Sequence, residues 1–494
     1  MTRIANAYEE DVAPTKINLS LPGFREDEGK IFVPPTVRYV EKQMRNESML
    51  AAEALPVWGD DKFLEAGIKF AYGTDEKRYR RDHVSAVQAI SLTGALRLAG
   101  TFLSRIPSRG RQVYLPSPST DEETRTLRDA GLEIRYYRFL DRKTGNVDFD
   151  GLREDILTAP ERSAILLFVT GSMPTGLDLS LTQWKSLITL LHQRNLIPLV
   201  VMAFQGLVTG DPSQDAEPLR LMAHEGLPVV LCQIFDATMG LYADSPSIVS
   251  IVTQSEESKE RVDGQLRGVA RGLYLHPSPW GAFVARAILS DSKLHPAWLV
   301  EIKAMSDRLR SVREKLYDLL ATKFKTPGTW SHIKKSVGMY CTTLLPPAVN
   351  DSLTLKRHIH LLPHGSISLG TLNSPKIEAL ARAIDSVVLA YNRELEEAQA
   401  QQLAMQIALA AAREAAAREE EEAEAQAAED EDRMLLEQDL ASAIEAQTRA
   451  EEDERRREEE EKGLEEAVRR AAERAETARA AEAILASITA GHAF

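Results

Sequence analysis

Between Val84 and about Thr253, the sequence alternates short, continuously apolar runs with amphipathic stretches of helical period. A run that is apolar at every position is typical of a parallel strand whose two faces are both covered by helices. The pattern therefore predicts a doubly wound α/β domain, with helices in stretches such as Thr182–Arg194 and Pro218–Glu225. The expected strands are Gln112–Pro116, Glu133–Phe139, Ser163–Thr170, Ile197–Phe204, Val229–Phe235 and Ile248–Val252.

After Pro279 the pattern becomes mainly helical. A long helix is expected around Ala297–Phe324, and a last helix is expected from Pro375 to about Asn392. Two or three short strands are expected between them, near Gly338–Leu345 and His358–Leu369. A smaller α+β domain fits this part of the chain.

The C-terminal tail from Arg393 onward has no proline, and its one aromatic residue is Phe494. Of residues 401–494, 27 are alanine, and Ala, Glu, Arg and Gln are strong helix formers. At 1.5 Å per residue, roughly 90 such residues would form a rod about 140 Å long. The tail is therefore predicted to be a long helix outside the globular core.

Small apolar residues recur in the tail at alternating steps of four and three, as in the seam of a coiled coil. No such seam runs through Glu451–Glu461, where Glu/Arg pairs alone would support a helix. Two interpretations stay open: a partner-binding coiled coil, or a solvated, partly disordered acidic tail. The seam consists of Leu464, Val468, Ala471, Ala475, Ala478, Glu482 and Leu485.

The net charge of −14 lies entirely in this tail, because residues 401–494 hold 26 acidic and 12 basic side chains. The remaining 48 acidic and 48 basic residues balance in residues 1–400. Nucleic acid is not an expected partner, since binding its phosphates needs a basic patch. No stretch reaches the roughly 18 apolar residues that span a bilayer, so a membrane is not expected either.

The two cysteines, Cys232 and Cys341, each lie in an apolar run, which argues against a disulfide framework or a zinc finger. The N-terminus turns acidic by Glu9, unlike a secretory signal or a transit peptide. A cytoplasmic location is predicted, and a mitochondrial one is less favoured. A metal site among His358, His360 and His364 is not expected, because spacing of two on a strand fits one solvated face.

A series of motifs runs in order through residues 15–392, and the body resembles the eukaryotic aspartate aminotransferases, which are fold-type I enzymes of pyridoxal phosphate. The resemblance implies an aminotransferase-like three-layer sandwich with a mainly parallel sheet. It further implies an N-terminal arm (1–30), a large domain (31–295), a small domain (296–392) and, outside it, the tail (393–494). The motifs include Ile17-Asn-Leu-Ser-Leu-Pro-Gly-Phe-Arg25, Ser91-Leu-Thr-Gly-Ala-Leu-Arg97, Met173-Pro-Thr-Gly176, Met202-Ala-Phe-Gln-Gly206, Gly240-Leu-Tyr242 and Leu361-Leu-Pro-His-Gly-Ser-Ile-Ser368.

In the family, a lysine forms a Schiff base with the cofactor and then moves protons on the substrate. The matching run here reads Ile234-Phe-Asp-Ala-Thr-Met-Gly-Leu-Tyr242, which puts Ala237 at the lysine position. No lysine lies between Lys185 and Lys259 to replace it. The resemblance therefore implies that covalent attachment of the cofactor is lost.

Other positions that the family uses to hold cofactor and substrate also differ. The phosphate cup falls on Ser91, Leu92 and Thr93, where a leucine side chain replaces the glycine of the family. Most of the exchanges remove polar atoms and leave apolar volume, so the old site is expected to be filled as core. The remaining altered positions are Val201 and Phe204 (ring contacts), Met173 (beside the ring), Thr120 (ring stacking), Ser245 (phosphate arginine) and Ser366 (carboxylate arginine).

Arg271 matches the family position that grips the distal carboxylate of the substrate from the neighbouring subunit. An interface salt bridge is an equally good interpretation of this one arginine.

These substitutions predict a non-catalytic pseudoenzyme without cofactor or metal, serving as a structural or scaffold subunit. It would bind protein partners through the 393–494 helix, could form a homodimer through its body, and by analogy would belong to a ciliary or cytoskeletal assembly. Two alternatives stay open. One is a protein that binds or senses a dicarboxylate or a molecule like pyridoxal phosphate, and the other is a regulatory partner of an active aminotransferase.

Overall fold

The computed structural model describes residues 2–21, 23–46, 54–74, 80–106, 110–440 and 455–472. The chain divides into two compact units. The first comprises residues 1–345 and 349–388, and the second comprises residues 346–348 and 389–494. The predicted boundaries at residues 30, 295 and 392 stay predictions.

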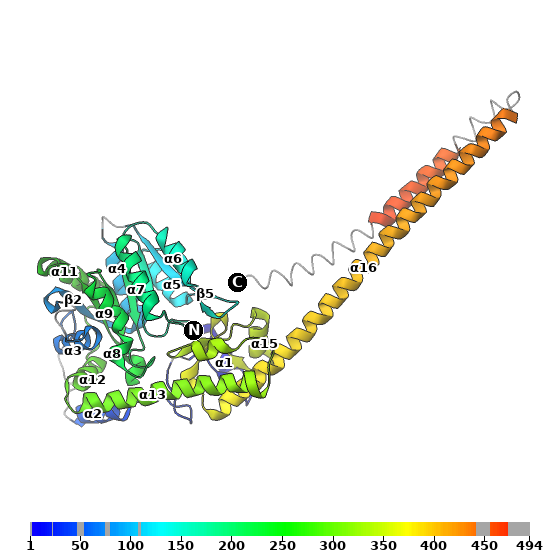
Figure 1. The fold of residues 1–494 in the computed structure, drawn as a ribbon. Helices are drawn as coiled ribbons and strands as arrows, with labels where there is room; N and C mark the ends of the chain where they lie inside the picture. Colours follow the sequence, from blue (N-terminus) through cyan, green and yellow to red (C-terminus); the bar gives the residue numbers. More distant parts are fainter. Residues whose placement is uncertain are drawn as a thin grey trace. The chain divides into compact units, whose positions relative to one another are not determined.

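A seven-stranded sheet forms the centre of the first unit (Figure 1). All of its strand pairs are parallel except those of β10, which runs antiparallel to both of its neighbours. The sheet confirms the predicted α/β fold with a mainly parallel sheet. Its order is β2 (Val84–Ile90), β10 (Pro246–Val252), β9 (Val230–Ile234), β8 (Ile197–Met202), β7 (Ala164–Phe168), β3 (Gln112–Ser117) and β4 (Glu133–Arg138).

Helices cover both faces of this sheet, because successive side chains of each strand point to opposite faces and both sets are apolar. In β8, Val200 and Met202 pack into a core shared with α7 (Leu181–Gln193) and α9 (Glu217–His224), whereas Val201 is buried on the opposite side. The helices α4 (Ser91–Ser104) and α11 (Glu256–Leu273) contact β2, and α4 also contacts β9 and β10. Three layers result, as predicted.

The C-terminal part of the first unit is mainly helical, also as predicted. It contains small sheets in which β1 pairs with β12 and β11 pairs with β13. The β1–β12 pairing ties the N-terminal segment to residues more than 300 positions away. The N-terminal segment contributes α1 (Thr2–Glu10), β1 (Ile17–Asn18), α2 (Pro35–Asn46) and α3 (Asp61–Tyr72). The C-terminal part contains α12 (Pro279–Ser290), α13 (Leu294–Tyr317), a π-helical stretch (Asp318–Lys323), α14 (Ser331–Lys335), β11 (Tyr340–Thr342), α15 (Pro347–Arg357), β12 (Ile359–His360) and β13 (Ser366–Ser368).

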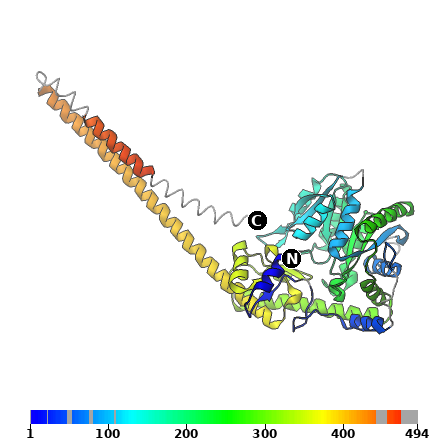
Figure 2. The same cartoon turned by 180° about the vertical axis from the view of Figure 1, so that it is seen from behind.

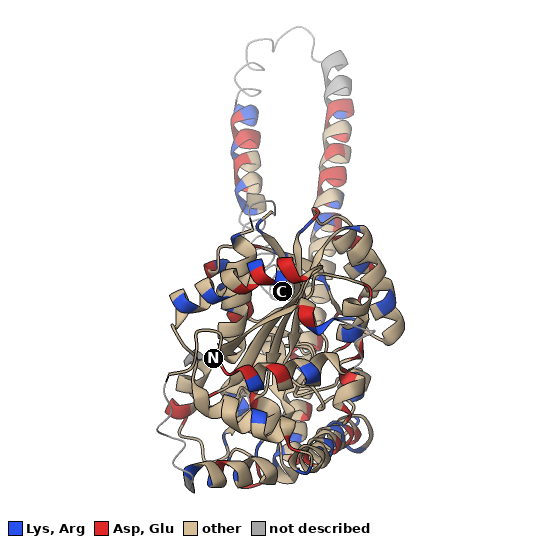
Figure 3. Cartoon of the chain, turned by 90° about the vertical axis from the view of Figure 1, so that its left-hand side faces the viewer, with Lys and Arg blue, Asp and Glu red and all other residues tan. Residues whose placement is uncertain are grey.

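The described part of the tail is helical, as its composition predicts, but it forms two helices and not the single rod that was expected. Helix α16 (Ser374–Leu440) is followed by a second helical stretch at 455–472, and Figures 1 and 2 show the two running side by side in opposite directions. Arg456 Nη2 lies 3.8 Å from Asp430 Oδ2, and Figure 3 shows charges of both signs along both helices.

Leu464 and Val468 of the predicted seam are 68% and 61% exposed, so the seam is not buried within this chain. Ala475, Ala478, Glu482 and Leu485 lie outside the described residues. Within the described residues, no helix has the length and apolar character needed to cross a membrane.

Candidate functional site

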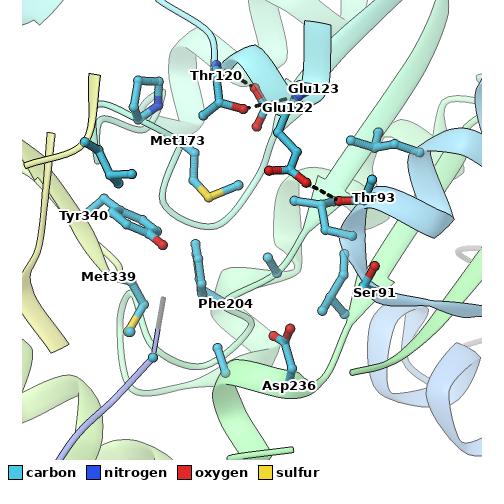
Figure 4. Close-up of a pocket in the computed structure, with 18 of the residues that line it drawn as sticks. Ser91, Thr93, Thr120, Glu122, Glu123, Met173, Phe204, Asp236, Met339 and Tyr340 are labelled. Atoms are coloured by element: carbon cyan, nitrogen blue, oxygen red, sulfur yellow. Dashed lines mark hydrogen bonds between the residues drawn. The ribbon is translucent and has the colours of Figure 1, made fainter. Parts of the chain in front are cut away.

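A cavity of about 270 Å³ lies at the carboxyl ends of four neighbouring strands of the central sheet. Ligands of open α/β sheets bind at this edge, where the loops after the strands meet. The residues after β3 contribute Thr120, those after β7 contribute Met173, those after β8 contribute Phe204, and those after β9 contribute Ala237. We call this cavity the sheet-edge pocket (Figure 4).

One wall of the sheet-edge pocket is the start of α4, which follows β2 without a loop. Ser91 makes this sharp change of direction with a φ of +59°, in the left-handed region. Leu92 and Thr93 then face the pocket, and Thr93 Oγ1 donates a hydrogen bond to Glu122 Oε1 at 3.1 Å. This bond connects the first turns of α4 and α5 (Asp121–Asp129) across the top of the pocket.

The start of α5 is a capping box, in which N-cap and N3 residues satisfy each other's backbone donors. Thr120 Oγ1 accepts from the backbone N–H of Glu123 at 3.3 Å, and Glu123 Oε2 accepts from the backbone N–H of Thr120 at 3.0 Å. The Glu123 side chain lines the pocket and is 98% buried. Its burial raises the pKa of the Glu123 carboxyl from 4.5 to about 7.

A second, half-buried carboxylate lies at the opposite end of the pocket, after β9. Asp236 begins the short helix α10 (Asp236–Met239) and accepts a hydrogen bond from Ser245 Oγ at 2.6 Å. Burial raises the pKa of Asp236 as well. Trp298 Nε1 holds this helix in place by donating to the carbonyl oxygen of Thr238 at 3.1 Å.

The remaining walls are apolar and aromatic. Figure 4 shows Met173, Phe204 and Tyr340 along one side of the pocket. The ring centroids of Phe204 and Tyr340 are 6.1 Å apart. The loop that carries Met173 is fixed by Asp178, whose carboxylate accepts from the backbone N–H groups of Gly171 and Ser172 at 2.9–3.0 Å.

Most of the residues that the resemblance singles out meet in the sheet-edge pocket. Val201, Ser245 and Ser366 are buried but are not among the lining residues, and Arg271 is exposed on α11. The roles assigned to all these positions stay predictions. The pocket is lined by Ser91, Leu92, Thr93, Thr120, Met173, Phe204 and Ala237 from the predicted set.

The expectation that apolar side chains fill this site is wrong, because the cavity remains open. Where one side chain replaces another of similar size, the wall of the pocket stays in place. At Ala237, the methyl group cannot fill the space of the lysine that the family has there.

Sequence analysis missed the carboxylates of Glu122, Glu123 and Asp236 as site residues. Acidic residues in a first helical turn are expected for capping alone, so the spacing gave no sign of a pocket.

The three histidines do not share one solvated face as expected, because His360 is buried. His358 Nδ1 and His360 Nε2 both lie within 3.0 Å of Asp11 Oδ2, and His364 lines the pocket instead. Among the described residues, no group of three or more His, Cys, Asp or Glu side chains is arranged to hold a metal ion.

Comparison with known proteins agrees with the fold. The profile of the family "Aminotransferase class I and II" matches residues 14–384. The chain belongs to this family. Aspartate aminotransferase 1 of Medicago sativa is 37% identical over 382 residues, covering 77% of this chain and 91% of the relative. The mitochondrial aspartate aminotransferase of Gallus gallus is 37% identical over 384 residues, covering 78% of this chain and 90% of the relative.

Solved structures give the same result. Aspartate aminotransferase from Trypanosoma cruzi has a TM-score of 0.72 and 33% identity, over 79% of this chain and 96% of that chain. An aromatic-amino-acid aminotransferase from Burkholderia pseudomallei, covalently bound to pyridoxal phosphate, has a TM-score of 0.75 and 29% identity. The match covers 78% of this chain and 96% of that chain. The family resemblance predicted from the motifs is therefore confirmed.

These relatives overturn the prediction of a non-catalytic structural or scaffold protein. They are named as enzymes and match more than three quarters of this chain, which favours an active aminotransferase. They also give no support to a ciliary or cytoskeletal role. The loss of several side chains does not by itself decide the function of the whole chain.

The aminotransferase family implies pyridoxal phosphate, and the lining of the pocket can be tested against this group. Covalent attachment needs an amine and the phosphate needs positive charge, but among the described residues no lysine or arginine lines the pocket. The lining carries the carboxylates of Glu122, Glu123 and Asp236 instead. The residues present do not fit a covalently held pyridoxal phosphate.

Proposed function

We propose that this member of the aminotransferase family takes a small amino-acid-like molecule as its substrate in the sheet-edge pocket. The observation that carries the proposal is the cavity of about 270 Å³ at the carboxyl ends of β3, β7, β8 and β9. Its volume is just below the range of about 300 to 1,000 Å³ typical of small-molecule sites. The named relatives support an enzyme that acts on an amino acid.

The side chains around the cavity support a binding role, because apolar walls and a few buried polar groups are the usual composition of ligand sites. Phe204 and Met173 supply apolar surface, Glu123 supplies a buried carboxyl group, and Asp236 supplies a half-buried one. The altered positions Ala237, Leu92 and Phe204 are proposed to set which molecule fits.

The test measures binding and turnover with the same purified full-length chain. A panel of amino acids and 2-oxo acids, with and without pyridoxal phosphate, is screened by ligand-observed NMR, and turnover of isotopically labelled substrate is followed by mass spectrometry. We expect saturable binding that is lost in Ala237→Leu, which fills the pocket. The control Ala411→Leu, at an exposed position of α16, should bind like wild type. Absence of binding and of turnover across the panel, in folded wild-type protein, would overturn the proposal.

The tail and the location of the protein are proposed separately. Exposed Leu464 and Val468 support a protein partner for the 393–494 helix, since large apolar side chains on a charged helix often mark a contact surface. Residues beyond 384 lie outside the family match, which supports a function of the tail apart from the pocket. The same proposal includes homodimerisation through the body and a role for Arg271 in the pocket of the neighbouring subunit. It also includes a cytoplasmic location.

A further inference from the structure

The charge of the sheet-edge pocket is negative. Asp121, Glu122, Glu123 and Asp236 line it, and no lysine or arginine among the described residues does. Burial lowers the pKa of His364, the remaining basic side chain of the lining, so that its imidazole is neutral at pH 7. The side-chain charges of the lining therefore favour a cation over an anion.

Glu123 provides an independent sign that a ligand belongs here. One of its oxygens completes the capping box, while Oε1 is buried and has no hydrogen-bond partner among the described residues. A buried carboxylate oxygen without a donor is costly, so a native structure that contains one needs an explanation. Figure 4 shows this carboxylate at the wall of the pocket, beside Thr120 and above Met173. A ligand that donates a hydrogen bond would supply the missing partner.

The start of α5 is closed to an anionic ligand. A helix N-terminus ordinarily favours anions, because its first N–H groups are unpaired and its dipole is positive there. In α5 the first turn already holds Asp121, Glu122 and Glu123, and the capping box occupies donors of that turn. A phosphate or dicarboxylate would meet like charges and few free donors.

Organic cations fit the pocket better than metal ions. The described residues include no group of three His, Cys, Asp or Glu side chains arranged for a metal. The opposite side offers Met173, Phe204 and Tyr340, which suit an apolar body attached to the charged head. Aromatic rings at this position would also attract the cation itself.

Building on the proposed function, we infer that the sheet-edge pocket binds a small organic monocation. Its protonated amine would donate to Glu123 Oε1, and its apolar body would lie against Phe204 and Met173. The amine is thus recognised by side chains of the protein and not by a covalent bond. Asp236, at the other end of the pocket, would favour a second donor on longer ligands.

The test compares three probes of nearly equal size: phenethylamine (cation), 2-phenylethanol (neutral) and phenylacetate (anion). Binding to the full-length chain at pH 8 is measured by isothermal titration calorimetry. Phenethylamine should bind at least tenfold more tightly than 2-phenylethanol, and phenylacetate should bind most weakly.

Glu123→Gln should lower the affinity for phenethylamine about tenfold and leave that for 2-phenylethanol unchanged. Gln keeps the capping box and removes the charge. The matched control Glu122→Gln removes a neighbouring charge on an exposed side chain and should have a smaller effect.

The pH dependence gives a second readout. Glu123 faces Glu122 on its own helix, Tyr137 of β4 and Tyr340 of β11. Burial raises the pKa of both tyrosines, so neither titrates between pH 6 and 8. Because Glu123 ionises in this range, affinity for phenethylamine should rise from pH 6 to pH 8 in wild type and stay flat in Glu123→Gln.

The outcomes separate this inference from the proposed function. If 2-phenylethanol or phenylacetate binds as tightly as phenethylamine, and Ala237→Leu abolishes that binding, the pocket is a ligand site but the inferred charge preference is wrong. If phenethylamine binds equally well to Glu123→Gln and wild type, the inferred anchor is wrong. If no probe and no compound of the amino-acid panel binds, both the inference and the proposed function fail.

Discussion

Replacing Glu123 by Gln should stabilise the ligand-free protein at alkaline pH. The carboxyl is 98% buried, and its pKa is raised from 4.5 to about 7. At roughly 1.4 kcal/mol for each pKa unit, this rise corresponds to about 3 kcal/mol of unfolding free energy. The folded pKa lies above the unfolded one, so the favourable contribution is complete below pH 4.5 and is lost as the pH rises through about 7.

The amide of Gln is neutral at every pH, and it can accept the same hydrogen bond from the backbone N–H of Thr120. Glu123→Gln should therefore match wild type near pH 4.5 and exceed it by about 3 kcal/mol at pH 8. Urea denaturation followed by circular dichroism at several pH values between 4.5 and 8.5 measures the difference.

Glu122→Gln is the matched control for this series. Glu122 is the preceding residue of the same helical turn, but its side chain is exposed. Its replacement should change the free energy of unfolding by no more than about 0.5 kcal/mol at either pH. The prediction is wrong if Glu123→Gln destabilises the protein at pH 8, or if it changes stability equally at pH 4.5 and 8. Either result would show that the ionised Glu123 carboxylate does not destabilise the folded state.

Three further predictions concern the folded body. Val201→Asp buries a carboxylate at a position 1% exposed in a central strand, and should cost several kcal/mol of unfolding free energy in a denaturant titration; a cost below 1 kcal/mol would contradict the packing described here. Gly176→Ala should cost more than Gly226→Ala by calorimetry, because both have a φ above +70° but only the added Cβ at Gly176 would meet a neighbour, the Tyr340 carbonyl oxygen at 2.1 Å; equal costs would refute the clash. Truncation after Asn392 should leave the melting temperature of the body unchanged, and aggregation of the truncated chain would show that the tail belongs to the fold.

Sequence patterns predicted the strands well wherever the apolar runs are continuous. The expected strand Ile197–Phe204 is β8, which ends two residues earlier, at Met202. β2 was missed because Ser85 and Gln88 interrupt its apolar run. Both side chains are buried but satisfied, since Ser85 Oγ donates to Asp263 and Gln88 Nε2 donates to the Ser278 carbonyl oxygen.

Strand direction could not be predicted from these runs at all. β10 is buried at every position from Pro246 to Ile251, like a parallel strand covered on both faces, yet it runs antiparallel to β9 and β2. A strand covered on both faces has the same composition in either direction. The direction is set by the path of the chain through α10 and the turn before Pro246, which no periodicity records.

The polar half of the site was hidden for a similar reason. Thr120 and Glu123 have the spacing of a capping box, and that function alone accounts for both residue types. Glu123 lies near Tyr137 of β4 and near Tyr340 of β11, which is more than 200 residues away in the sequence. Only the folded chain shows that one carboxylate serves a helix cap and a cavity at once.

Glu123 also connects the stability of the fold to the use of the pocket. A glutamine would complete the capping box equally well, so capping does not require the charge. The charge lowers the stability of the ligand-free protein above pH 7, and this cost is relieved only when a cation donates to Oε1. Ligand binding and the pH dependence of unfolding are therefore two measurements of one group. Saturating phenethylamine should abolish the stability advantage of Glu123→Gln at pH 8, because the bound cation then stabilises the buried Glu123 carboxylate, which only the wild type has.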